Sequence, residues 1–260
     1  MMDLISAVVL GVVEGATEFL PISSTGHLIL FNQWFAFGED FTKLFNIVIQ
    51  SGAILAVIII FWKDLWPSTW SLKELESKWG RIIAAFIPTA VIGLLLGDYT
   101  EKYLFTPSVV AAALIFYGLV FIFLEKSKKM EYAHSQIVYS HALIIGAAQA
   151  LALVPGTSRS GATIVAMLLL GYTRAAAARF SFLLAIPTLL AASAYSLYKY
   201  ESSIQSQELG LLAIGFIVSF IVAFAVSKWF LAYVSQKSFL PFAWYRIILG
   251  LLVLALVILN

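Results

Sequence analysis

Long apolar stretches constrain the fold of this chain more than any other feature of its sequence. Six stretches are roughly 17–25 residues long, enough for a helix to cross a hydrocarbon core about 30 Å thick. They cover residues near 44–62, 80–97, 108–124, 179–198, 209–233 and 239–259. Hydrophobic residues make up 62% and charged residues 12% of the 260 residues, too much apolar surface for a soluble fold to hide. The sequence therefore predicts one all-α integral membrane domain over residues 1–260, with the lipid bilayer as its solvent.

Four shorter apolar runs form two pairs, each interrupted by Pro, Gly, Ser and Thr residues. The runs lie near 4–20 and 26–37, and near 141–154 and 161–172. Irregular backbone at membrane depth is tolerated only where protein or a water-filled cavity surrounds it. Each pair is therefore predicted to be a re-entrant helix–loop–helix element, with four additional crossings as the alternative.

The two interrupted elements resemble each other. A shift of 135 residues aligns Gly11 with Gly146, Glu14 with Gln149, Ser23 with Ser158, Thr25 with Ser160 and Gly26 with Gly161. This internal repeat divides the chain at about 1–125 and about 136–260, with one re-entrant pair and three spans in each part. Because three is odd, the second repeat enters the membrane from the opposite face. Such inverted-topology repeats bring discontinuous helices together near the bilayer midplane.

The basic residues predict the orientation of the chain. One face receives Lys43, Lys102 and Lys199, and the other receives Lys63, Lys73, Lys78, Arg81, Lys126, Lys128, Lys129, Arg174, Arg179, Lys228, Lys237 and Arg246. The positive-inside rule makes the second face cytoplasmic, so the first interrupted element opens outward. Tyr245 and Arg246 are interpreted as interfacial anchors at the start of the last span. A net charge of +2, with scattered basic residues, argues against a nucleic-acid partner.

Two carboxylates precede the first interruption. Glu14 and Glu18 are four residues apart, so they project from one face of a helix, one turn apart. Two like charges repel unless a cation lies between them or one of them is protonated. Carboxylate oxygens suit Mg²⁺ or Ca²⁺, so the pair is a candidate metal site and a candidate catalytic pair. The alternative is a neutral carboxyl group bonded to the loop backbone.

Hydroxyl groups gather where the second helix of the first pair begins. Ser23, Ser24 and Thr25 can cap this helix, whose free N–H groups form a positive dipole end suited to an anion. One hydroxyl is enough for a cap, so three in a row predict phosphate binding as well. His27 lies about one turn into the helix and is a candidate catalytic residue.

The second interruption repeats this pattern and adds an arginine. Ser158, Ser160, Gly161 and Thr163 surround a predicted helix start, and Arg159 offers a planar fork of five donors. An arginine beside a helix N-terminus at membrane depth is suited to phosphate. The second interruption is therefore a candidate phosphate site. An internal salt bridge from Arg159 to Glu14 or Glu18 is the alternative.

Together these residues resemble a known signature. Glu14 and Glu18 run into the segment FLPISSTGH at 19–27, and the segment PGTSRSGAT occupies 155–163. The combination is similar to the undecaprenyl-diphosphate phosphatases, the bacitracin-resistance family of membrane proteins, over essentially the whole chain. The resemblance implies hydrolysis of undecaprenyl diphosphate, with a divalent cation, at the outer face of the bacterial inner membrane. It also implies that this reaction recycles the lipid carrier for peptidoglycan synthesis.

A mechanism follows as a hypothesis. Ser24 would attack the terminal phosphorus, His27 would accept its proton, and Glu18 would orient His27 or the metal. Attack by Ser158 or by a metal-bound water is the rival assignment. A secondary transporter or flippase of an anionic lipid is the alternative function, because inverted repeats with broken helices are also typical of transporters. The sequence leaves the oligomeric state open, a homodimer included.

Overall fold

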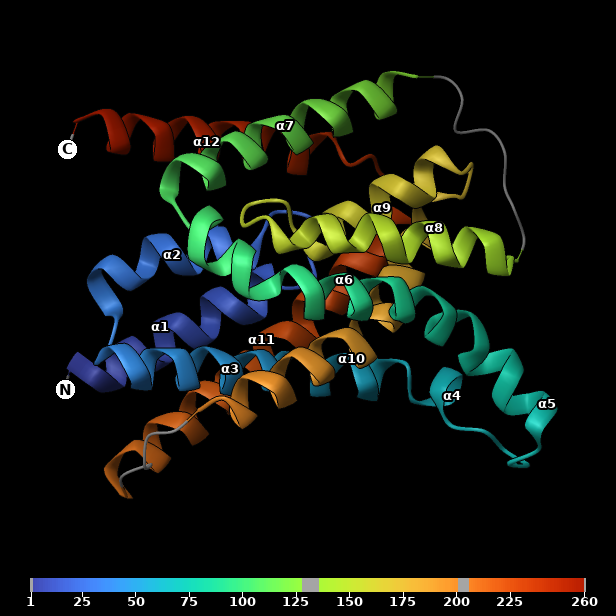
Figure 1. Cartoon of the computed structure of the whole chain (residues 1–260), viewed down its shortest axis with the longest axis horizontal. Helices are drawn as coiled ribbons and strands as arrows, with labels where there is room; N and C mark the ends of the chain where they lie inside the picture. Colours follow the sequence, from blue (N-terminus) through green and yellow to red (C-terminus); the bar gives the residue numbers. More distant parts are fainter. Residues whose placement is uncertain (1, 128–135, 201–205, 260) are drawn as a thin grey trace.

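A computed structural model describes residues 2–127, 136–200 and 206–259, and all of its regular elements are helical (Figure 1). In chain order they are α1 (Met2–Thr17), α2 (Ser24–Phe35), α3 (Glu39–Ile60), α4 (Trp62–Leu65), α5 (Leu72–Leu75), η1 (Glu76–Gly80), α6 (Arg81–Leu104), α7 (Pro107–Lys126), α8 (Tyr139–Gln149), η3 (Ala150–Leu153), α9 (Arg159–Leu169), α10 (Arg174–Tyr198), α11 (Ser206–Val234) and α12 (Leu240–Leu259). Two of the basic residues assigned to the cytoplasmic face, Lys128 and Lys129, lie outside the described residues.

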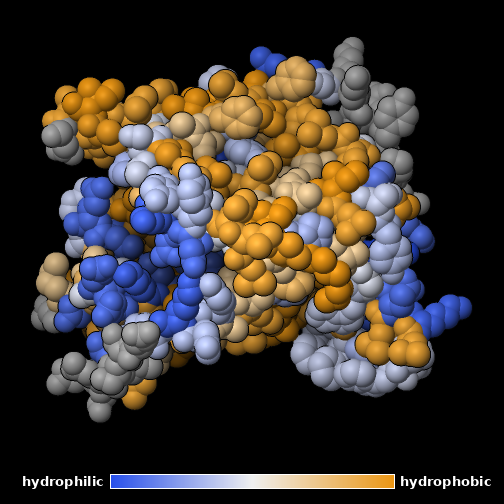
Figure 2. Space-filling view, viewed as in Figure 1, coloured by the Kyte–Doolittle hydropathy of each residue, from blue (hydrophilic) through white to orange (hydrophobic). Residues whose placement is uncertain are grey.

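Within the described ranges, six helices are long and apolar enough to cross a membrane. They are α3, the continuous segment Leu72–Leu104 that ends in α6, α7, α10, the part Glu208–Val234 of α11, and α12. Each coincides with one of the six predicted apolar stretches, so this prediction is confirmed. Figure 2 shows apolar side chains over the middle of one face, with hydrophilic residues gathered toward its two ends. The chain is an all-α, multi-pass membrane protein.

The four shorter runs form two helix hairpins. α1 and α2 contact each other and are joined by the first loop (residues 18–23), while α8 and η3 contact α9 and are joined to it by the second loop (residues 154–158). Figure 1 shows the two hairpins extending toward opposite ends of the molecule, with their loops near its centre. In each hairpin the two helices are separated by an irregular loop at the position where the sequence predicts an interruption. Their re-entrant placement in the bilayer stays a prediction.

Helix packing follows the predicted repeat. Under the 135-residue shift, α1, α3 and α6 correspond to α8, α10 and α11. α1 packs on α11 as α8 packs on α6, and α3 packs on α11 as α10 packs on α6. α7 and α12, which also correspond, pack on each other. The same neighbours therefore recur in both parts of the chain, which supports the internal repeat.

Glycines allow the closest of these contacts. A Cβ on Gly11 of α1 would lie 2.9 Å from the carbonyl oxygen of Gly215 in α11. At the equivalent position of α8, a Cβ on Gly146 would lie 1.9 Å from the carbonyl oxygen of Ala85 in α6. Small residues of this kind let membrane helices approach backbone to backbone. The close approach brings α1 and α8, which lead into the two loops, against long helices.

Apolar side chains of the first loop pack against α10 in the core. In the most apolar part of α10, 50% of the residues are buried. In that of Leu72–Leu104 only 11% are buried, so α10 is central and α6 faces outward. Phe19 and Leu20 of the first loop belong to the same buried cluster as Phe182 of α10. The rings of Phe19 and Phe182 lie 5.0 Å apart, centroid to centroid. Apolar side chains of the loop thus hold its polar backbone at a defined depth.

Candidate functional site

The same helix cap begins α2 and α9. Ser23 (φ 71°) and Ser158 (φ 73°) both adopt a left-handed backbone that residues other than glycine rarely adopt. The Ser23 Oγ accepts a hydrogen bond from the Gly26 N–H at 3.3 Å, and the Ser158 Oγ accepts one from the Gly161 N–H at 3.1 Å. Equal strain at equivalent positions indicates that both loops take one special conformation. Both α2 and α9 begin at these loops, which lie near the centre of the molecule (Figure 1).

A pocket of about 180 Å³ lies where the two loops meet. Its polar lining comes from both loops and from α2, α3, α6, α8, α9 and α10: Glu18, Ser23, Ser24, Thr25, Gln50, Thr89, Gln149, Ser158, Arg159 and Thr188. Leu153, Pro155 and Leu189 are among its apolar lining residues. The pocket therefore combines hydroxyl, carboxylate and guanidinium groups from segments far apart in the sequence.

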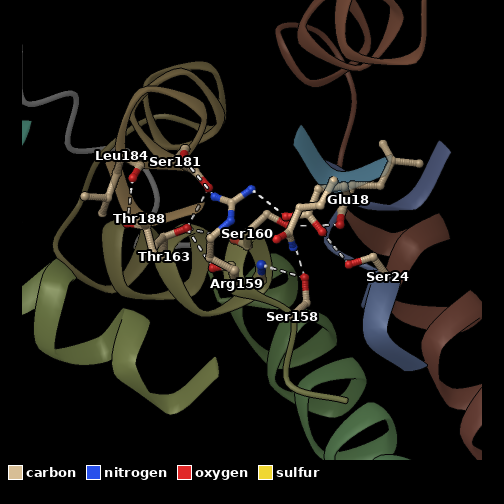
Figure 3. A network of polar contacts seen from close by, with 12 residues as sticks. Glu18, Ser24, Ser158, Arg159, Ser160, Thr163, Ser181, Leu184 and Thr188 are labelled. Carbon is tan, nitrogen blue, oxygen red and sulfur yellow. Dashed lines mark hydrogen bonds and ion pairs between the residues drawn. The ribbon is translucent and has the colours of Figure 1, made fainter. Parts of the chain in front are cut away.

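Glu18 joins the two hairpins chemically. Its Oε2 accepts a hydrogen bond from the Ser24 Oγ at 2.5 Å, and its Oε1 lies 3.5 Å from the Arg159 Nη2. Figure 3 shows the Arg159 guanidinium between Ser181 and Glu18, with Ser24 on the far side of Glu18. The Arg159 Nη1 donates to the Ser181 carbonyl at 3.0 Å. The predicted alternative, an internal Arg159–Glu18 salt bridge, is therefore present in this structure.

Arg159 nevertheless keeps donor capacity. The salt bridge is long at 3.5 Å, and the Arg159 Nε has no hydrogen-bond partner among the described residues. The guanidinium also lies over the Phe19 ring, 5.5 Å from its centroid, which orients it without using a donor. A buried arginine with an unused N–H can still receive an anion in the pocket.

His27 bonds to Ser23 and Tyr245, and not to Ser24 as predicted. Its Nδ1 lies 2.7 Å from the Ser23 carbonyl oxygen, and its Nε2 lies 2.6 Å from the Tyr245 hydroxyl. Because a carbonyl only accepts, Nδ1 carries the proton and Nε2 accepts from Tyr245. Ser24 donates to Glu18 instead, so the expected Ser24–His27 hydrogen bond is not formed. The strained cap at Ser23 turns the imidazole back toward the loop backbone.

The remaining hydroxyls of the second hairpin bond within the protein. The Ser160 Oγ donates to the Leu20 carbonyl at 2.9 Å, so it ties the second hairpin to the first loop. The Thr163 Oγ1 lies 2.6 Å from the Ser181 Oγ of α10 and 3.0 Å from the Ser160 carbonyl. In the pocket as the described residues define it, Ser160, Gly161 and Thr163 lie behind the lining. Thr25, Ser23 and Ser158 do line it.

Glu14 is a buried carboxylate of α1. It is 1% exposed, and both of its oxygens lack a hydrogen-bond partner among the described residues. It lies one helical turn before Glu18, whose backbone N–H donates to the Glu14 carbonyl at 2.9 Å. An isolated buried carboxylate is expensive unless it binds a proton or a cation. Glu14 is therefore suited to a ligand that supplies positive charge.

A divalent cation fits these residues. The described residues contain no group of three or more His, Cys, Asp and Glu that could hold a metal without other ligands. Mg²⁺ rarely uses such a group, because it commonly takes one or two carboxylates and completes its shell with substrate phosphates and water. Glu18 lines a pocket whose other groups suit a phosphate, and Glu14 lies one helical turn before Glu18, behind the lining.

Sequence reasoning missed the role of Arg246. It was expected to anchor the interface, but its side chain is fully buried between the two loops. Its Nη1 donates to the Pro21 carbonyl at 3.0 Å, and its Nη2 donates to the Gly156 and Thr157 carbonyls at 2.8 and 2.9 Å. The anchor prediction is therefore wrong for Arg246, whereas the neighbouring Tyr245 is 44% exposed. An arginine inside an apolar run was the available signal, because intramembrane charges are rare and functional.

The fold and the pocket define the class of protein. It is a multi-pass α-helical membrane protein whose charged pocket forms between two interrupted helix pairs. The family model described as bacitracin resistance protein BacA matches residues 7–252, and the chain belongs to this family. The predicted family membership is confirmed.

Relatives match over nearly the full length of the chain. The undecaprenyl-diphosphatase of Enterococcus faecalis is 44% identical over 265 residues, which cover 97% of this chain and 96% of the relative. That of Nitrobacter hamburgensis is 45% identical over 263 residues, or 98% of each chain. That of Polaromonas sp. strain JS666 is 45% identical over 261 residues, or 97% of this chain and 94% of the relative.

Proposed function

We propose that this protein hydrolyses undecaprenyl diphosphate to undecaprenyl phosphate and inorganic phosphate. One observation carries the proposal: Ser24, Glu18 and Arg159 form a connected set in a pocket inside a membrane-spanning fold. A hydroxyl beside a base supplies a nucleophile, and a guanidinium supplies charge for a phosphoryl group. The names of its relatives support the same reaction. The product would return the lipid carrier to peptidoglycan synthesis, and the activity would confer bacitracin resistance.

In the proposed first step, the Ser24 oxygen attacks the terminal phosphorus and its proton passes to Glu18. The bond between this phosphorus and the bridging oxygen breaks, and undecaprenyl phosphate leaves. Arg159 and the helix N-termini stabilise the charge that develops on the phosphoryl oxygens. Glu18 replaces His27 as proton acceptor in this scheme, because Ser24 donates to Glu18 at 2.5 Å.

In the second step, water hydrolyses the phosphoserine. This restores the Ser24 hydroxyl and releases inorganic phosphate, and the proton held by Glu18 leaves to solvent. Attack by Ser158 is the rival scheme. The Ser158 Oγ accepts from Gly161 and lies 3.0 Å from the Ser160 Oγ, so it serves the cap of α9. Those contacts favour Ser24 as the nucleophile and give Ser158 a supporting role.

Glu14 and Glu18 would hold the divalent cation, Mg²⁺ or Ca²⁺. When bound, the cation would neutralise part of the charge of the diphosphate. His27 would fix the first turn of α2 through its bonds to Ser23 and Tyr245, and thereby the position of Ser24. We further propose that the pocket opens to the cell exterior or periplasm, because the predicted outer face carries three basic residues, Lys43, Lys102 and Lys199, against twelve on the other face.

The direct test is release of inorganic phosphate from undecaprenyl diphosphate by the purified protein in detergent. We expect turnover by the wild type and none by Ser24→Ala, which should still bind the substrate. The alternative, a transporter or flippase, needs no nucleophile beside a base. Movement of the lipid across proteoliposomes without phosphate release would refute the phosphatase proposal in favour of that alternative.

A further inference from the structure

We propose that Arg246 is a positioning residue that holds the two loops in register for phosphoryl transfer, an inference that rests on the proposed function. Its guanidinium bonds to carbonyls on both sides of the pocket: Pro21 in the first loop, and Gly156 and Thr157 in the second. A third element joins through the Ala113 carbonyl of α7 at 3.4 Å. One side chain thus ties together segments that belong to different halves of the chain.

The chemistry of this contact requires an arginine. Carbonyl oxygens of loops have no helical N–H to accept from, and leaving them unpaired inside the protein is costly. A planar guanidinium offers donors in several directions at once, whereas an ammonium is a single compact charge. In the described part of the chain, Arg246 has no ion-pair partner, and its charge is met by carbonyl dipoles and by the Tyr117 ring, 5.5 Å from the guanidinium carbon to the ring centroid. The residue therefore acts through backbone geometry.

The position of Arg246 connects this geometry to the reacting groups. Pro21 lies between Glu18 and Ser24 in the first loop, and Thr157 precedes the cap of α9 that places Arg159. The neighbouring Tyr245 bonds to His27 in α2. Ser160 supplies a second tie between the halves, through the Leu20 carbonyl. If the loops shift against each other, the nucleophile moves relative to the phosphate that Arg159 holds.

This arrangement predicts a specific kinetic defect. Arg159, which holds the phosphate, keeps its bond to the Ser181 carbonyl without help from Arg246, so substrate binding should largely survive a change at Arg246. Alignment of Ser24 with phosphorus depends on both hairpins, and small misplacements are costly in rate. We expect Arg246→Lys to lower kcat by at least about tenfold while KM stays within about threefold of wild type, and Arg246→Met to lower kcat further.

The experiment compares these variants with Arg179→Lys, a matched change at an exposed arginine that pairs with Asp64. Activity is expressed per folded protein, measured by thermal unfolding in detergent, so a purely structural role would leave kcat unchanged. Wild-type kcat in folded Arg246→Lys would overturn the proposal. If that variant does not fold, Ser160→Ala decides: an unchanged kcat overturns the proposal, and a selective fall in kcat supports it. A wild type that releases no phosphate would instead refute the phosphatase function.

Discussion

At the scale of single residues, each charged group of the pocket depends on a partner from another segment. Glu18 in the first loop meets Arg159 at the start of α9, and Arg159 meets the Ser181 carbonyl in α10. Glu18 and Arg159 carry opposite charges, and both side chains are largely buried. Little water reaches either group, so each charge is compensated mainly by the other. The chemistry of the pocket therefore responds to small changes in shape as well as in charge.

The two candidate serine nucleophiles should differ sharply. Ser24→Ala should lower kcat by about three orders of magnitude or more, because the attacking oxygen is removed. Ser158→Ala should lose a helix cap, about 1 kcal/mol of stability, and keep measurable turnover. Phosphate release by purified protein measures both. The reverse order would transfer the attack to the second loop, and similar partial losses would favour water as the nucleophile.

Arg159→Lys should be a severe change although it keeps the charge. A guanidinium can hold two phosphate oxygens and the Ser181 carbonyl together, and an ammonium cannot. We expect kcat/KM to fall at least about tenfold, equivalent to about 1.4 kcal/mol of transition-state stabilisation. Steady-state kinetics with Arg179→Lys as the control provide the measurement. Wild-type kinetics in Arg159→Lys would exclude Arg159 from substrate binding.

Removing the cation should stop the reaction. Excess EDTA should abolish phosphate release and added Mg²⁺ should restore it, because Glu14 would otherwise remain an uncompensated buried carboxylate. Glu14→Gln keeps the shape of the side chain and removes its charge, so it should need a higher Mg²⁺ concentration for half-maximal activity. Full turnover in EDTA would contradict a role for the metal.

Residue spacing and the internal repeat predicted some of the side chains that meet at the pocket, but not the bonds between them. Glu18, Ser24 and Arg159 were predicted as site residues, and the structure brings them together at one pocket. The partner of Ser24 was not predictable, because helical periodicity ignores the left-handed cap at Ser23 that redirects His27. The contacts of Arg246 depend on how α12 packs against loops far away in sequence, which no local pattern encodes.

At the scale of elements, length and apolarity predict the spans but not where the helices end. The apolar stretch near 80–97 marks the crossing, whereas α6 continues to Leu104. Its polar end stays helical because helix propensity does not require apolar residues, and Asp98 there pairs with Lys199 at 2.7 Å. The two hairpins were predicted because Pro, Gly and Ser clusters break helices.

The crossing of α8 and α6 gives a prediction at this scale. Gly146→Ala would place a Cβ against the Ala85 carbonyl, so it should lower stability by about 1–3 kcal/mol through overpacking. It should also lower activity, because the Gly146 carbonyl accepts from Thr89 at the pocket. Gly97→Ala in α6 has nothing within 4 Å of the new Cβ and is the matched control. Equal unfolding temperatures for the two variants would contradict the close contact.

At the scale of the whole molecule, the pocket is shared between the two halves of the chain. The first hairpin supplies Glu18 and Ser24, and the second supplies Ser158 and Arg159. This sharing is what the inverted repeat predicts, since equivalent loops from opposite faces meet near the middle. The orientation of the molecule in the membrane consequently decides which side of the cell the pocket serves.

Cysteine labelling tests that orientation, because the native chain contains no cysteine. Single cysteines at Lys43 and Glu101, both exposed, should react with an impermeant thiol reagent in intact cells whose outer membrane, where present, is permeable. A cysteine at exposed Ser77 should react only after the inner membrane is opened. The same topology predicts labelling of Thr100 and Ser202 in such cells and of Ser135 only after the inner membrane is opened, but Thr100 is buried and so is a poor probe, and Ser135 and Ser202 lie outside the described residues. Labelling of Ser77 and Glu101 from the same side would contradict the topology.

The wide sequence separation of the loop contacts has a consequence for biosynthesis. The Leu20 carbonyl accepts from the nearby Ile22 N–H and from Ser160, 140 positions later, whereas the Pro21 carbonyl accepts from Arg246, 225 positions later. A ribosome therefore delivers the first hairpin to the membrane long before its partners exist. Until the last helix emerges, the exposed carbonyls must be served by water or by the insertion machinery. A chain that ends before α12 would lack the Arg246 donor for the Pro21, Gly156 and Thr157 carbonyls, and both loops would stay open.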